Sequence, residues 1–122
     1  VVLLGTPNQG SELADVEAGL PGTILELAGP TAQMLGTGPD GFPASLPAPN
    51  FEVGVIAGTQ DAIVTNEWLP LPNDSMVSLE SAKLEGMRDF REFELTHWGL
   101  RNSLEVAEAT IGFLNAGRFP EH

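Results

Sequence analysis

The chain begins with a short apolar run, residues 1–4 (Val-Val-Leu-Leu), that ends at Gly5-Thr6-Pro7. An uninterrupted apolar run is typical of a parallel strand buried on both faces, and the glycine and proline predict a loop at its carboxyl end. Such a strand normally has a neighbour on each edge, so it is an unusual place for a domain to begin. The sequence therefore predicts either the back part of a larger α/β protein or a minimal one that pairs its first strand with a partner.

Composition narrows the class of protein. A chain of 122 residues is enough for a single domain, expected over residues 1–122, with a modest core. Its 17 acidic and 5 basic residues leave a formal net charge of −12, which argues against nucleic acid and anionic membranes as partners. No apolar run approaches the roughly 20 residues that cross a bilayer, and no signal peptide is visible. These features favour a soluble protein, with the cytoplasm preferred and the compartment left open.

Two further strands and a long loop are expected. Residues 51–58 (FEVGVIAG) are β-branched and aromatic and lie between turn-forming residues, which predicts a strand. Residues 90–95 (FREFEL) mix apolar and charged side chains and alternate over the last four, which predicts a strand near the edge of the sheet. Residues 36–50 have no periodicity and are expected to form a loop. Strands that alternate with helices predict an α/β fold with a short, mostly parallel sheet.

The clearest helix is predicted over residues 104–116, with Asn102 or Ser103 as its N-cap and Gly117 just after its last residue. Its expected buried stripe consists of four apolar residues near helical spacing: Leu104, Ala107, Ile111 and Leu114. Shorter helical segments are expected at residues 11–18, 23–27, 30–35 and 81–86.

Polar residues follow each expected strand at its carboxyl end. They lie at residues 6–11, at Asp61 or Asp74, and at residues 96–98 (Thr-His-Trp). Because the carboxyl ends of parallel strands meet at one edge of a sheet, we expect these side chains to converge. An acid followed by a histidine before the last helix matches the Ser-Asp-His order of α/β-hydrolases, in which the carboxylate orients the imidazole that takes the serine proton.

Four segments together carry a family resemblance: LLGTPNQGSELAD, FEVGVIAGTQDAIV, LPLPNDSMVSLESAKLEGM and FELTHWGLRNSLEVAEATIGFLNAGRF. They resemble the C-terminal half of bacterial α/β-hydrolases of the lipase/esterase type, in particular the lipase-like and PGAP1-like branch. That branch has a Gly-Thr-Pro-x-x-Gly-Ser loop, an Asn-Asp-Gly-x-Val-Ser motif that carries the triad acid, and a Thr-His motif before the last helix. The resemblance implies a partial α/β-hydrolase fold over nearly the whole chain.

The resemblance also implies roles for individual residues. Asp74 falls on the triad acid of the family and His97 on its general base, while Ser75 replaces the usual glycine. Asp61 is a rival acid, because its Gly-x-x-Asp-x-x-Val setting also carries the acid in many α/β-hydrolases. Trp98 either lines an acyl pocket or only packs the loop after the last strand.

The nucleophile of the family is missing. No G-x-S-x-G motif occurs in the sequence, so the nucleophile and most of the oxyanion hole are expected upstream of Val1. Ser11 is the candidate substitute nucleophile, although it more naturally caps the helix that follows it. No cofactor is expected, and no metal site either. The chain has no cysteine, and a single histidine with the scattered carboxylates Glu80, Glu85 and Asp89 is not metal-ligand spacing.

The sequence therefore predicts a portion of a serine carboxylester hydrolase that acts on an ester or lipid-like small molecule. It would do so once an upstream hydrolase segment or a partner chain completes the site. The alternative is a non-catalytic minimal hydrolase-fold module that forms a homodimer through its exposed first strand.

Overall fold

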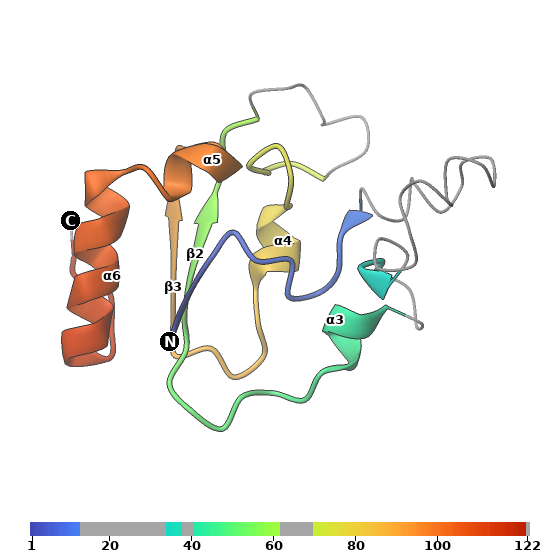
Figure 1. The fold of residues 1–122 in the computed structure, drawn as a ribbon, viewed down its shortest axis with the longest axis horizontal. Coiled ribbons are helices and arrows are strands. Elements are labelled where there is room, and N and C mark those ends of the chain that lie inside the picture. Colours follow the sequence, from blue (N-terminus) through green and yellow to red (C-terminus); the bar gives the residue numbers. More distant parts are fainter. Residues whose placement is uncertain (13–33, 38–40, 62–69, 122) are drawn as a thin grey trace.

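A computed structural model describes residues 1–12, 34–37, 41–61 and 70–121 (Figure 1). The strands are β1 (Val2–Leu4), β2 (Gly54–Gly58) and β3 (Asp89–Phe93). The helices are α3 (Phe42–Ser45), α4 (Leu79–Ala82), α5 (His97–Leu100) and α6 (Leu104–Ala116). No helix in these ranges is long and apolar enough to cross a bilayer.

The three strands form one parallel sheet in the order β1-β2-β3, which confirms the predicted α/β class. Every residue of β2 is buried, as expected for a central strand. Among the described strands β3 lies at an edge of the sheet, as its mixture of apolar and charged side chains predicted. The prediction for the first strand was wrong in one respect: β1 is only half-buried, because among the described residues it pairs with β2 alone.

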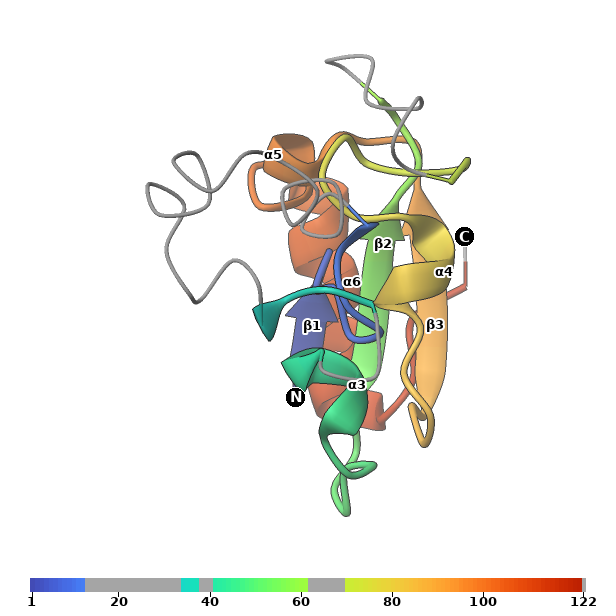
Figure 2. The ribbon, with the colours of Figure 1, turned by 90° about the vertical axis from the view of Figure 1, so that its right-hand side faces the viewer.

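Helices cover both faces of the sheet (Figure 2). On one face, Ile56 and Phe93 of the strands pack against the buried side of α6. On the other face, Val53 and Val55 pack in a cluster with Ala82 of α4. Figure 2 shows α3 and α4 in front of the sheet, α6 behind it and α5 at the carboxyl ends of the strands. This two-sided burial explains why residues 53–57 are apolar without alternation.

The bounds of α6 agree with the prediction. The Ser103 hydroxyl accepts a hydrogen bond from the backbone N–H of Val106, and Gly117 adopts the left-handed backbone conformation just after the last helical residue. The predicted buried stripe was wrong. The residues that face the sheet are Val106, Ala109 and Phe113, and the four residues of the predicted stripe are exposed. The helix carries apolar residues on two sides, and its contact with the sheet decides which of them is buried.

Two adjacent substitutions in α6 test this assignment. Phe113→Ala is expected to lower the free energy of unfolding by about 3–5 kcal/mol, because it removes a 2 % exposed aromatic ring from the core. Leu114→Ala removes a side chain that is 63 % exposed and is expected to change the free energy of unfolding by less than about 1 kcal/mol. Urea denaturation monitored by circular dichroism measures both. Equal losses would contradict the observed orientation of the helix.

The short helices depart from the sequence prediction. The loop expected at 36–50 contains α3, which has a proline in its first turn and the N–H of Leu46 bonded back to Pro43 O. α4 begins two residues before the helical turn expected at 81–86, because Ser78 caps it. The four-residue α5 was not predicted. The helices expected at 11–18, 23–27 and 30–35 fall wholly or mostly outside the described residues.

Candidate active site

His97 lies at the carboxyl edge of the sheet, four residues beyond the end of β3. Thr96 caps α5 through its hydroxyl, which accepts a hydrogen bond from the backbone N–H of Gly99 at 3.0 Å. The backbone N–H of His97 donates to the carbonyl oxygen of Asp74 at 2.7 Å. The position of the histidine is therefore set by its own helix cap and by a backbone contact with the segment that follows β2.

Asp74 presents one carboxylate oxygen to the backbone and the other to the histidine. Its Oδ1 accepts hydrogen bonds from the backbone N–H groups of Met76 at 3.0 Å and Val77 at 2.7 Å. Its Oδ2 lies 2.9 Å from Nδ1 of His97. The Asp74 side chain is 1 % exposed and that of His97 is 34 % exposed. The carboxylate is thus held rigidly inside, while the imidazole reaches the surface.

This arrangement selects one tautomer of the neutral imidazole. A carboxylate only accepts hydrogen bonds, so Nδ1 of His97 carries the proton that it donates to Asp74. The lone pair is then on Nε2, where a general base needs it. The pair can take a proton on Nε2 and stabilise the resulting imidazolium with the buried carboxylate.

The end of β1 contacts the same pair. Gly5 has φ +57°, and a Cβ atom added to it would lie 2.9 Å from Oδ2 of Asp74 and 3.0 Å from Nδ1 of His97. A side chain at this position would therefore displace the pair. The sequence analysis did not identify Gly5 as a site residue. The available signal was a glycine between an apolar strand and a Thr-Pro turn, which indicates a special backbone conformation but not what lies beside it.

The loop after β1 is tied to α4. The side-chain amide of Asn8 donates to the carbonyl oxygen of Ala82 at 2.7 Å. The hydroxyl of Ser78, which caps α4, donates to Oε1 of Glu12 at 2.7 Å. Because α4 starts five residues after Asp74, these bonds hold the carboxyl end of β1 in place relative to the acid.

The other predicted site residues have different surroundings. The Trp98 ring stands edge-on to the His97 ring, with centroids 6.2 Å apart, and is 40 % exposed. Asp61 lies three residues beyond the end of β2 and is partly buried. Ser11 is half-buried, and its backbone N–H donates to Leu35 O. The helix that Ser11 was expected to cap lies mostly outside the described residues. No group of three or more His, Asp or Glu side chains in the described ranges is placed to hold a metal ion.

Fold and site together define an α/β protein of lipase-like architecture with an acid–histidine pair at the carboxyl ends of parallel strands. No protein-family model matches the chain, and no curated protein does so. Among solved structures, Bacillus licheniformis lipase BlEst2 in its propeptide form is similar, with a TM-score of 0.64 and 20 % sequence identity over 93 % of this chain. Its mature form gives a TM-score of 0.57 and 18 % identity over 94 % of this chain.

The chain corresponds to only part of these lipase chains. The match covers 28 % of the propeptide form and 53 % of the mature form. At this level of sequence identity the likeness shows a common fold.

Proposed function

We propose that this chain is the acid–histidine portion of a serine carboxylester hydrolase. The observation that carries the proposal is the 2.9 Å contact between Nδ1 of His97 and Oδ2 of the buried Asp74. The lipase-like fold and the place of the pair at the carboxyl edge of the sheet support it, because function in open α/β folds resides at that edge.

Each residue has a defined part in the proposed reaction. Nε2 of His97 takes the proton of a serine hydroxyl as the serine oxygen attacks the ester carbonyl carbon. The imidazolium then gives this proton to the alcohol oxygen as the ester bond breaks. A water molecule repeats the sequence on the acyl-serine and releases the carboxylic acid. Asp74 orients the ring and stabilises the imidazolium, and Trp98 flanks the approach to His97.

The serine comes from outside these 122 residues, since they contain no G-x-S-x-G motif. Ser11 is the candidate within the chain. A nucleophile must lie within hydrogen-bond reach of the base. We propose that Ser11 does not fill this role, because a serine at this place in the sequence more naturally caps the segment that follows it.

A fluorophosphonate probe with intact-mass readout tests the proposal. The 122-residue chain is expected to form no adduct. A longer product of the same gene is expected to form one adduct per molecule, on a serine outside residues 1–122, and to lose that labelling in His97→Ala. A stoichiometric adduct on Ser11 of the 122-residue chain would contradict the proposal. So would an unlabelled longer product.

The alternative is a non-catalytic module that self-associates through β1. The observation that favours it is the half-buried state of β1, which pairs with β2 alone among the described residues. Analytical ultracentrifugation tests this alternative. A non-catalytic module is expected to form a dimer at micromolar concentration and to show no esterase activity. A monomer at high concentration would count against this alternative.

A further inference from the structure

Glu12, in the loop after β1, contacts the residue that caps α4. Its Oε1 accepts a hydrogen bond from the hydroxyl of Ser78 at 2.7 Å, and its Oε2 is shielded from solvent. Within the described part of the chain, this hydroxyl is the one hydrogen-bond partner of the Glu12 carboxylate. Burial of a carboxylate costs free energy unless its bonds offset the loss of water. Stability alone therefore does not explain an acidic side chain at residue 12.

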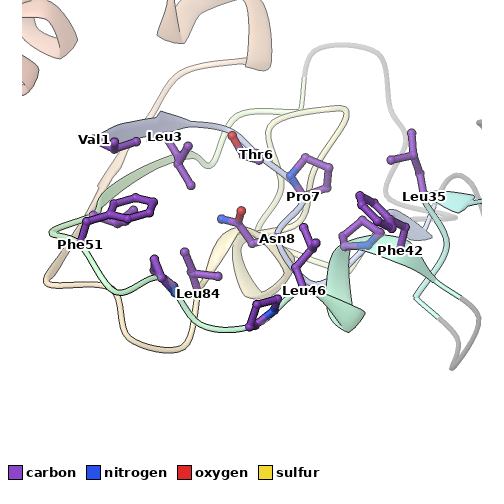
Figure 3. Close-up of a pocket in the computed structure, with 14 residues that line it drawn as sticks. Val1, Leu3, Thr6, Pro7, Asn8, Leu35, Phe42, Leu46, Phe51 and Leu84 are labelled. Carbon is purple, nitrogen blue, oxygen red and sulfur yellow. The ribbon is translucent and has the colours of Figure 1, made fainter.

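The rest of the loop holds Glu12 in place. The side-chain amide of Asn8 donates to Ala82 O at 2.7 Å, and the backbone N–H of Gln9 donates to Ser81 O at 2.9 Å. Asn8 is one of the side chains that line an apolar groove between this loop and the segment before β2 (Figure 3). The loop thus binds carbonyl groups at the C-terminal end of α4, which have no partner within the helix. Glu12 binds the cap at the opposite end.

Ser78 joins Glu12 to the turn that carries the acid. Its hydroxyl accepts a hydrogen bond from the backbone N–H of Ser81 at 3.2 Å and directs its own proton at Glu12. The residue is buried, and it pairs with Asn73 in an antiparallel bridge. Asn73 directly precedes Asp74 in the chain. A shift of Ser78 therefore moves the base of the turn from which the Asp74 side chain projects.

The turn Asn73–Ser78 has little freedom to absorb such a shift. Ser75 is fully buried and has φ +87°, and its backbone N–H donates to Oδ1 of Asn73 at 2.9 Å. The backbone N–H of Asp74 donates to Val77 O at 3.1 Å. A non-glycine residue at positive φ has only a small allowed region of backbone conformation. A displacement of Ser78 is therefore passed on to Asp74.

We propose that Glu12 is a positioning residue for the acid–histidine pair. Through Ser78 it fixes the turn that aims Oδ2 of Asp74 at Nδ1 of His97, across a contact of 2.9 Å. Glu12 acts through Ser78 and takes no part in the chemistry. Its effect on catalysis rests on the proposed function, whereas its effect on the geometry of the pair does not.

A second contact between the same loop and the same helix provides a matched control. The buried hydroxyl of Ser81 donates to the carbonyl oxygen of Gly10. Ser81→Ala removes this bond but keeps the backbone N–H that bonds to Ser78. The loss of a buried hydrogen bond lowers stability at either contact. Only the contact between Glu12 and Ser78 leads to the turn that carries Asp74.

The tautomer of His97 reports on the position of Asp74 without relying on catalysis. The tautomer of a neutral imidazole follows the hydrogen bonds that its two nitrogens make. When Oδ2 of Asp74 leaves hydrogen-bond range, the ring proton is shared between Nδ1 and Nε2. Two-bond ¹H–¹⁵N NMR spectra in mildly alkaline solution distinguish these states. The chain has two histidines, so a His122→Ala background leaves the ring of His97 as the only imidazole signal.

Glu12→Ala in the 122-residue chain is expected to convert His97 from the Nδ1–H tautomer to a mixture of both tautomers. Ser78→Ala removes the other partner of the same hydrogen bond and is expected to give the same mixture. Ser81→Ala is expected to keep the Nδ1–H tautomer, and circular dichroism establishes that each variant folds. An unchanged tautomer in the folded Glu12 or Ser78 variant would overturn the proposal. An equal change in Ser81→Ala would do so as well.

Glu12→Gln is the conservative variant. The amide oxygen of a glutamine still accepts the proton of the Ser78 hydroxyl, so this variant is expected to keep the Nδ1–H tautomer. The comparison distinguishes the hydrogen bond from the negative charge. The same mixture of tautomers in Glu12→Gln as in Glu12→Ala would overturn the role of this hydrogen bond.

In the longer product of the same gene, Glu12→Ala is expected to slow fluorophosphonate labelling by about 10-fold, since misplacement of catalytic groups by about 1 Å costs about 10²-fold in rate. Ser81→Ala is expected to label at nearly the wild-type rate. A changed tautomer in Glu12→Ala, with no adduct in the unsubstituted longer product, would support the positioning role and refute the hydrolase. A His97-dependent adduct, with an unchanged tautomer in Glu12→Ala, would support the hydrolase and refute the positioning role.

Discussion

In the complete form of the proposed hydrolase, Asp74→Asn is expected to lower kcat for ester hydrolysis by about 10⁴-fold, with little change in the fold. The reason lies in how the carboxylate is shared. Oδ1 accepts two backbone N–H groups, from Met76 and Val77, so the carbonyl oxygen of an asparagine would take that side. Its NH₂ group would then face Nδ1 of His97 and force that nitrogen to accept. The proton would move to Nε2, where the base needs a lone pair.

Asp61→Asn is the matched control for this prediction. Asp61 is the rival acid of the sequence analysis, and the same change there is expected to alter kcat only a few-fold. Initial rates with p-nitrophenyl butyrate, together with circular dichroism to establish that both variants fold, make the comparison. A large loss in Asp61→Asn combined with a small one in Asp74→Asn would reverse the assignment of the acid.

Gly5→Ala is expected to damage both stability and catalysis. The residue has φ +57°, where a non-glycine residue costs about 1–2 kcal/mol. The new Cβ would also lie 2.9 Å from Oδ2 of Asp74 and 3.0 Å from Nδ1 of His97, so these side chains must shift away from residue 5 by several tenths of an ångström. Misplacement of catalytic groups by about 1 Å costs about 10²-fold in rate, so we expect a loss of kcat of that order.

Gly86→Ala distinguishes the backbone cost of a positive φ from the effect of contact with the acid–histidine pair. Gly86 also has positive φ, at +83°, but the nearest atom to its added Cβ is the Cβ of Ala48, at 3.6 Å. The backbone cost should therefore appear in the free energy of unfolding of both variants, and the loss of kcat only in Gly5→Ala. Urea denaturation and steady-state kinetics measure the two effects. Equal kinetic losses would show that the contact of Gly5 with the acid–histidine pair is not the cause.

Local sequence signals predicted the parts of the fold that short-range interactions specify. The limits of α6 follow from Ser103 and Gly117, which act on backbone groups within one turn of the helix. β2 was predicted within 51–58 because β-branched residues in a continuous apolar run suit a strand buried on both faces. The sequence analysis did not predict α5, and it placed α4 two residues too late. Both are one-turn helices, which are too short to show any periodicity.

The sequence predicted only part of the candidate site. Chain order alone put a carboxylate before a histidine, but it left Asp61 and Asp74 as alternatives. Both follow β2, and no local pattern specifies which of them reaches a residue beyond β3. In the structure the turn at Asn73–Ser78 brings Asp74 to His97, because its backbone N–H groups hold one oxygen of Asp74 and leave the other for the imidazole.

The sequence by itself determined the α/β class, the extent of the long helix, and the absence of a G-x-S-x-G serine. Those properties depend on residue types and on contacts between near neighbours along the chain. Only the tertiary structure decided that Phe113 rather than Leu114 faces the sheet, that Gly5 touches the acid–histidine pair, and that Asp74 meets His97. Each of these depends on the packing of segments far apart in sequence, for which a local pattern carries no information.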